Sequence, residues 1–224
     1  MQVHFKAAAL AAAALCCPWA QADTGKLVLT GGVSSIDGAA GGGLTPWAVI
    51  GSNATDGEIG ASANISRART HDYGLTTYGA AIGILNRVEL SVAQQNFDAS
   101  AATALNGIAP FGVTPGQHIH MDILGAKVRV LGDAVLDSDN WVPQVAVGVE
   151  HKTTHPGSLN SVLSFLGTKT SGTDFYVSAT KLFLAQGVLV NATLRNTNAN
   201  QNGLLGFGSA APGRNTRSWQ PELS

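Results

Sequence analysis

Charged residues are scarce in this chain of 224 residues. They make up 12% of the sequence, about half of the ~25% that is usual for a soluble domain. A surface in contact with water needs charged side chains, so the shortage favours an exterior that faces something other than water. The few charges are also nearly balanced, with 13 basic and 14 acidic residues. The sequence has no basic stripe of the kind that indicates a nucleic-acid-binding protein.

Cysteine is limited to Cys16 and Cys17, and both lie in a predicted secretory signal peptide, residues 1–22. A short apolar run follows Lys6, and an Ala-Gln-Ala cleavage pattern ends it, which is the organisation of a signal peptide and not of a membrane anchor. The mature domain, residues 23–224, would then have no disulfide, thiol catalyst or lipid anchor.

Long apolar runs and catalytic motifs are also missing. No run reaches the ~18 to 20 residues that a transmembrane helix needs. There is no Gly-x-Ser-x-Gly nucleophile elbow. The glycine run at residues 41–43 lacks the lysine and hydroxyl residue of a phosphate-binding loop. The sequence therefore predicts no catalytic residue and no cofactor.

The clearest positive feature is period-two alternation between Tyr73 and Phe97, which predicts two long β-strands. In the second strand Val88, Leu90 and Val92 share one face, and charged or small residues occupy the other. Such a strand is typical of a soluble sandwich with an apolar core, or of an outer-membrane barrel whose apolar face contacts lipid.

The alternation and the turn residues predict nine strands, with a tenth beginning near Ser218. The nine lie at residues 26–34, 47–53, 58–66, 75–85, 87–95, 118–130, 141–152, 175–184 and 188–196. The connections between them are long and short in turn, as in outer-membrane barrels, which have short periplasmic turns and long outer loops. The predicted fold class is all-β, an antiparallel up-and-down transmembrane β-barrel. Because bacterial barrels have even strand numbers, we expect about twelve strands in the full-length protein, of which these residues contain about nine.

Several runs of residues are similar to those of a known family. They are Thr-Gly-Gly-Val at 30–33, Gly-Gly-Leu-Thr-Pro-Trp-Ala at 42–48, Gly-Ala-Lys-Val-Arg at 125–129, Pro-Gln-Val-Ala-Val-Gly at 143–148 and Gly-Leu-Leu-Gly-Phe-Gly at 203–208. In these runs the chain resembles the proteobacterial family called domain of unknown function 3034, over nearly the whole mature chain. The resemblance implies a Gram-negative envelope protein with a barrel-like β fold, and it assigns no activity.

Charged residues on the predicted strands fall opposite the apolar face. A charge that faces hydrocarbon costs ~2 to 4 kcal/mol at mid-bilayer, so these side chains are predicted to line the barrel lumen. They are Arg87, Glu89, Lys127, Arg129, Glu150, Lys152 and Arg195. Two interpretations remain open: ion pairs that fill a narrow barrel, and charges that set the selectivity of a channel.

One strand carries His118, His120 and Asp122 at alternate positions. This spacing could place two imidazoles and a carboxylate on one metal ion. A solvated strand end explains the same residues without a ligand, so we predict no metal site.

Taken together, these patterns predict a non-enzymatic protein in the outer membrane of a Gram-negative bacterium, either a porin-like channel or a barrel that binds a small solute. Its expected partners are outer-membrane lipid and the barrel insertion machinery. Two alternatives remain: a barrel enzyme that acts on lipid or polysaccharide, and a soluble periplasmic β protein that binds a ligand.

Overall fold

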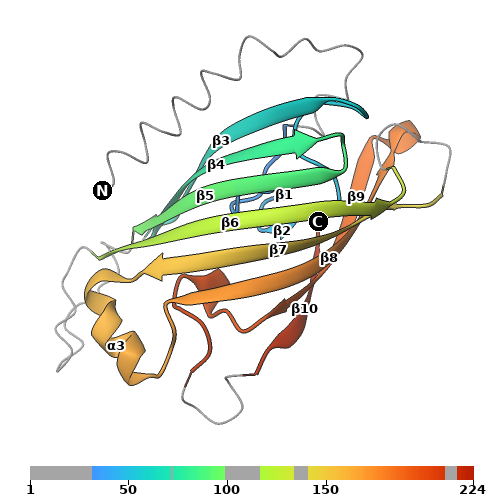
Figure 1. Ribbon diagram of the computed structural model, residues 1–224. Helices are drawn as coiled ribbons and strands as arrows, with labels where there is room; N and C mark the ends of the chain where they lie inside the picture. The colour runs from blue at the N-terminus through green and yellow to red at the C-terminus, as the bar shows by residue number, and fades with distance from the viewer. Residues whose placement is uncertain (1–31, 72, 99–116, 134–140, 210–215) are drawn as a thin grey trace.

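The protein is built on one large curved antiparallel β-sheet (Figure 1). The computed structural model describes residues 32–71, 73–98, 117–133, 141–209 and 216–224. Eight strands follow one another across the sheet in chain order, and every neighbouring pair is antiparallel. They are β3 (Ile59–Arg69), β4 (Gly74–Ile84), β5 (Val88–Asp98), β6 (His118–Leu131), β7 (Gln144–His155), β8 (Ser171–Phe183), β9 (Val188–Thr197) and β10 (Ser218–Leu223). The prediction of an all-β antiparallel fold is confirmed.

The two ends of the sheet differ in the length of their connections. One end, here called the long-loop end, has the connections at residues 70–73, 99–117, 156–170 and 198–217. The other, the short-turn end, has those at residues 85–87, 132–143 and 184–187, the last of which contains η4 (Leu184–Gln186). Strand β3 begins and β10 ends at the short-turn end. The sheet therefore has an even number of strands, and the chain enters and leaves it at the same end.

Residues 32–57, here called the inner segment, lie against the concave face of the sheet (Figure 1). They contain a small hairpin of β1 (Gly41–Gly42) and β2 (Thr45–Pro46). The two-residue turn between them starts at Gly43, whose φ of 58° favours glycine. Ala48, Val49 and Ile50 are 1% exposed or less.

The inner segment corrects the prediction of a strand at residues 47–53. These residues form bends and pair with no strand, because side chains of the sheet satisfy their backbone groups. The amide of Ala48 donates to Thr180 Oγ1 at 2.8 Å, and its carbonyl accepts from Gln144 Nε2 at 2.7 Å. The predicted strand at residues 26–34 lies partly outside the described residues, and residues 32–34 hold only one isolated bridge, Ser34 to Ala40.

The described sheet is not closed into a barrel, because β3 and β10 each pair on one side only. In β3 the pairing with β4 starts where the Leu85 amide donates to the Glu58 carbonyl at 2.7 Å. The odd-numbered residues from Ile59 to Arg69 therefore direct their N–H and C=O groups to the free edge.

The free edge of β10 follows the same rule. Ser224 exchanges two backbone hydrogen bonds with Asn191, at 2.8 and 3.0 Å. The backbone N–H and C=O groups that point to the free edge are therefore those of Trp219, Pro221 and Leu223, except that proline has no N–H. Proline has no N–H, so Pro221 takes a position in an edge strand that removes no hydrogen bond from the ladder.

The two faces of the sheet have opposite character, and the polar side chains are the buried ones. Lys127, Lys152, Glu89 and Glu150 are among the largest fully buried side chains on the concave face. On the convex face large apolar side chains are exposed, among them Leu124 at 58%. An apolar core exists mainly at the long-loop end. There, Ile119, Met121 and Ile123 pack beneath η3 (Gly157–Leu159), α3 (Asn160–Phe165) and η5 (Gln201–Gly203), with Leu159 and Leu204 as contacts. No described helix is long and apolar enough to cross a membrane.

Candidate functional site

The structure places the seven predicted lumen residues in three environments. Glu89, Lys127, Glu150, Lys152 and Arg195 are buried on the concave face, each 2% exposed or less. Arg129 is on the same face at the short-turn end and forms ion pairs with Asp56 and Asp133, at 3.1 and 3.0 Å. Arg87 is exposed in the turn between β4 and β5.

Glu89 and Lys127 form a clamp on the backbone of the inner segment. Lys127 Nζ lies 3.0 Å from Glu89 Oε2, and it also donates to the carbonyls of Ala40 and Trp47, at 3.2 and 3.0 Å. The Glu89 carboxylate accepts from the amides of Ala40 and Gly51, at 3.1 and 2.6 Å. One ion pair thus holds three points of the inner segment against β5 and β6.

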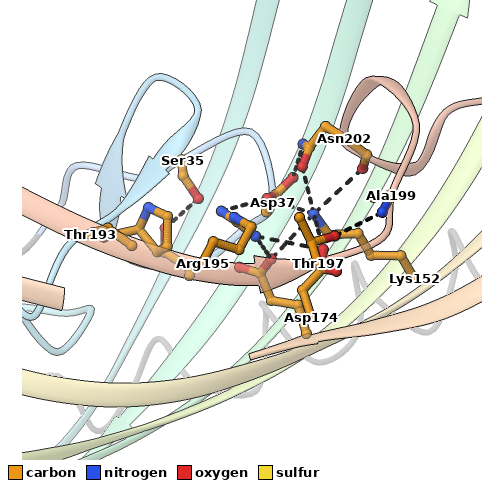
Figure 2. A network of polar contacts seen from close by, with 12 residues as sticks. Ser35, Asp37, Lys152, Asp174, Thr193, Arg195, Thr197, Ala199 and Asn202 are labelled. Atoms are coloured by element: carbon orange, nitrogen blue, oxygen red, sulfur yellow. Dashed lines mark hydrogen bonds and ion pairs between the residues drawn. The ribbon is translucent and has the colours of Figure 1, made fainter. Parts of the chain in front are cut away.

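A second group of charges lies nearer to the long-loop end (Figure 2) and is here called the inner ion cluster. Lys152 Nζ is 3.1 Å from Asp37 of the inner segment, 3.3 Å from Glu150 and 3.3 Å from Asp174. Arg195 bonds Glu150 through Nη1 and Glu222 through Nε, the latter at 2.7 Å. The inner ion cluster consists of Asp37, Glu150, Lys152, Asp174, Arg195 and Glu222.

Asp37 connects the inner ion cluster to more of the molecule. Its Oδ1 accepts from Gln95 Nε2 at 2.9 Å and from Asn202 Nδ2 at 3.1 Å. Asn202 Oδ1 in turn accepts from Lys152 Nζ at 2.8 Å. This set therefore ties β5, β7 and the loop before β10 to a single carboxylate on the inner segment, as Figure 2 shows for Asp37, Lys152 and Asn202.

The inner ion cluster has four carboxylates and only two cationic side chains. Burial raises the pKa of Asp37, although the ammonium of Lys152 beside it acts in the opposite direction. Glu150 Oε1 and both oxygens of Asp174 are buried without a hydrogen bond among the described residues. An ion pair buried in this way adds little net stability, but removing one partner is costly because the other charge stays buried.

His118, His120 and Asp122 lie on the convex face of β6, at the long-loop end. His118 pairs with Asp98 at 3.8 Å, and Asp122 pairs with His155 at 3.2 Å. His120 lies directly across from His155 in the ladder between β6 and β7. In the part of the chain that the structure describes, no three His, Cys, Asp or Glu side chains are arranged to hold a metal ion.

Sequence reasoning missed three members of the inner ion cluster. Asp174 continues the inward alternation of Tyr176 and Ser178, so a strand boundary set one residue earlier would have included it. Glu222 likewise shares the inward-facing parity of Gln220 in β10. Asp37 has no local signal, because it lies in an irregular loop and its partners are distant in the sequence.

The chemistry of this site is that of a packed polar interior. Among the described residues its buried groups hold the inner segment and each other, and a few of their oxygens and nitrogens, such as both oxygens of Asp174, make no hydrogen bond. A cleft of about 340 Å³ opens beside it, lined by residues that include Thr45, Arg195, Asn202 and Glu222.

The fold and the site define an all-β protein with polar side chains buried under an inner segment and apolar side chains exposed on the convex face. The family model described as "Protein of unknown function (DUF3034)" matches residues 30–224, and the chain belongs to this family. The resemblance given by the sequence runs is thereby confirmed. No curated protein and no solved structure matches the chain.

Proposed function

We propose that this protein is an integral outer-membrane β-barrel protein whose interior is filled by its own inner segment. The observation that carries the proposal is the inverted polarity of the sheet. Lys127 and Lys152 are buried to 1% exposure or less, whereas Leu90 and Leu124 are 49% and 58% exposed. In water such a surface would be unfavourable, because large exposed apolar patches promote aggregation. In a bilayer the same surface contacts hydrocarbon.

The apolar side chains of the convex face form a band across the sheet, which Lys181 of β8 interrupts near the short-turn end. At the long-loop end every strand changes from apolar to polar, at a level that moves by six residues along the ladder from β3 to β9. The last outward-facing apolar residues are Ile65, Tyr78, Val92, Leu124, Val149, Phe175, Leu194 and Trp219. From one strand to the next this boundary shifts by no more than one outward-facing position. A boundary that shifts gradually from strand to strand is what a planar interface, such as that of a bilayer, gives when it crosses tilted strands.

The height of the band is largest on β8, where the outward-facing apolar residues run from Phe175 to Phe183. Eight residues at ~3.3 Å per residue span ~26 Å. With the ~40° tilt that is usual for membrane barrels, this length gives a height of ~20 Å, a little below the ~25 Å apolar band of outer-membrane barrels.

Trp141 and Phe183 make an edge-to-face contact at 6.4 Å near the short-turn end, which agrees with an interfacial girdle at that border. At the long-loop end Tyr73 stacks on Phe97 at 5.6 Å, but Phe97 packs with Ile119 and Leu159 on the concave side.

The free edges of β3 and β10 must be covered in this environment. Each unpaired backbone group in hydrocarbon costs several kcal/mol, and both edges carry such groups. The proposal therefore includes the barrel of about twelve strands that the sequence predicts, with further strands pairing to both edges. It also includes export by the predicted signal peptide and assembly by the barrel insertion machinery.

The filled interior favours one of the two interpretations left open by the sequence. Glu89 and Lys127 bind the inner segment, and Lys152 and Arg195 bind its Asp37. The proposed role of the lumen charges is therefore to hold this segment in place. Passage of a solute would require the segment to move.

A pair of charge substitutions on one strand tests the proposal. Leu90 is in the middle of the apolar band of β5, and Asn96 faces outward on the same strand beyond the band. Leu90→Arg should destabilise the folded protein in lipid vesicles by ~2 to 4 kcal/mol, whereas Asn96→Arg should destabilise it by only ~0 to 1 kcal/mol. The measurement is a urea titration of the vesicle-bound protein. Equal effects of the two substitutions would contradict the assignment of the convex face to lipid.

A further inference from the structure

Two arginines at the border of the apolar band have no partner among the residues that the structure describes. Arg67 and Arg69 are exposed on β3, at the two outward-facing positions that follow Ile65. Neither guanidinium has an ion pair or hydrogen bond to another described residue. Their neighbours across the ladder are Thr76 and Gly74, so no acidic side chain lies directly opposite either of them.

The other charges on the described part of this border are already paired. Asp122 is bound by His155 at 3.2 Å and by Gln94 at 3.0 Å. Arg217 donates to Asn196 Oδ1 and to the Asn196 carbonyl, at 2.6 and 2.7 Å, and its guanidinium lies over the ring of Phe175. Among the described residues, the two arginines of β3 therefore have no partner on the side of β4, whereas Asp122 and Arg217 are paired; their other side is the free edge of β3.

The positions of these arginines match the headgroup region of a bilayer. Outward-facing residues two apart on a strand are ~6.6 Å from each other, so Arg67 begins about one such step beyond the hydrocarbon-facing Ile65. A guanidinium presents several N–H donors in a planar fork and binds phosphate in a bidentate manner. Two of them on one face of one strand can bind the same phosphate from two sides.

We propose that Arg67 and Arg69 bind the phosphate group of a phosphorylated lipid in the outer leaflet. This inference rests on the proposed function and specifies the lipid class that the barrel surface selects. The acyl chains of that lipid lie along the apolar band next to Ile65. The headgroup phosphate lies between the two guanidinium groups and neutralises them.

The test uses the full chain in detergent, with lipid binding followed by native mass spectrometry. The probes are lipid A with its phosphates, the same lipid after dephosphorylation, and inorganic phosphate. The variants are Arg67→Gln/Arg69→Gln and, as a control, Arg87→Gln, which removes an exposed arginine at the short-turn end.

We expect the double substitution to weaken binding of phosphorylated lipid roughly tenfold or more, because two charge-assisted hydrogen-bonding groups are lost. Arg87→Gln should leave the binding unchanged. Equal binding by the double variant and the wild type, or equal binding of dephosphorylated lipid, would overturn the inference. Full competition by inorganic phosphate would show that the site takes free phosphate instead of a lipid. Failure of the proposed function is distinguishable, because the charge substitutions at Leu90 and Asn96 report membrane insertion without involving either arginine.

Discussion

Lys127 Nζ and Glu89 Oε2 lie 3.0 Å apart on neighbouring strands, and both side chains are 1% exposed. Both also bind backbone atoms of the inner segment, which neither could do from a solvent-facing position. The pair therefore connects the polarity of the sheet to the filling of its concave face. In a soluble sheet of the usual kind these two positions would hold apolar residues.

The first prediction concerns this pair. Lys127→Met leaves the Glu89 carboxylate buried without its cation, and we expect the free energy of unfolding to fall by ~3 to 5 kcal/mol. The double variant Lys127→Met/Glu89→Gln should regain part of this loss, because no unpaired charge remains. A double-mutant cycle by urea unfolding measures both effects. A loss below ~1 kcal/mol for Lys127→Met, the range of an exposed pair, would contradict the burial of the clamp.

The second prediction concerns conductance. Because the inner segment fills the concave face, wild-type protein in a planar bilayer should show no steady current. Glu89→Ala removes the acceptor of the Ala40 and Gly51 amides, so it should produce frequent openings. Asp122→Asn removes a carboxylate from the convex face and should not. A large steady current in the wild type would show that the interior is open.

The third prediction follows from the raised pKa of Asp37. A carboxyl group with a raised native pKa holds its proton more tightly in the folded state than in the unfolded state. Its contribution to stability is therefore fully present below the unfolded pKa of ~3.9 and is lost as the pH rises through the native pKa. The difference in unfolding free energy between wild type and Asp37→Asn should fall as the pH rises through this window. A difference that grows with pH would mean that the ion pair with Lys152 outweighs burial.

The fourth prediction concerns the space beneath Tyr176. Gly148 lies opposite Tyr176 in the ladder between β7 and β8, and a Cβ atom at this glycine would overlap the phenol ring. Gly148→Ala should therefore destabilise the protein by ~1 to 3 kcal/mol, as other overpacked sites do. Gly74→Ala is the matched control, because its Cβ would meet Asp98 Cβ at an ordinary 3.5 Å. Equal Tm values for the two variants would show that Tyr176 can move away.

The sequence predicted most of the sheet because alternation is a local signal. In β5, Val88, Leu90 and Val92 alternate with buried residues, as expected. The sorting of loop length by sheet end is present only in part, because the long-loop end also has the short connection at residues 70–73 and the short-turn end the longer one at residues 132–143. The strand predicted at residues 47–53 is wrong because the apolar residues of this stretch resemble a strand although the stretch pairs with none. Their burial depends on side chains such as Thr180, which is 132 positions away from Ala48.

The candidate site was predictable only in part, for the same physical reason. Glu150, Lys152 and Arg195 lie on regular strands, so parity alone places them on the concave face. Asp37 reaches the inner ion cluster through the path of an irregular loop, and no periodic pattern describes that path. The sequence therefore could not predict that the inner segment fills the concave face of the sheet.

The most direct test of the account is the environment of single side chains on the convex face. Residues 23–224 contain no cysteine, so a spin label can be placed at Leu124→Cys on the convex face and at Gln186→Cys in the short turn. In lipid vesicles, oxygen should relax the label at position 124 strongly and a water-soluble nickel chelate should relax it weakly. The label at position 186 should show the reverse. Strong relaxation of the label at position 124 by the nickel chelate would place the convex face in water and contradict the proposed membrane location.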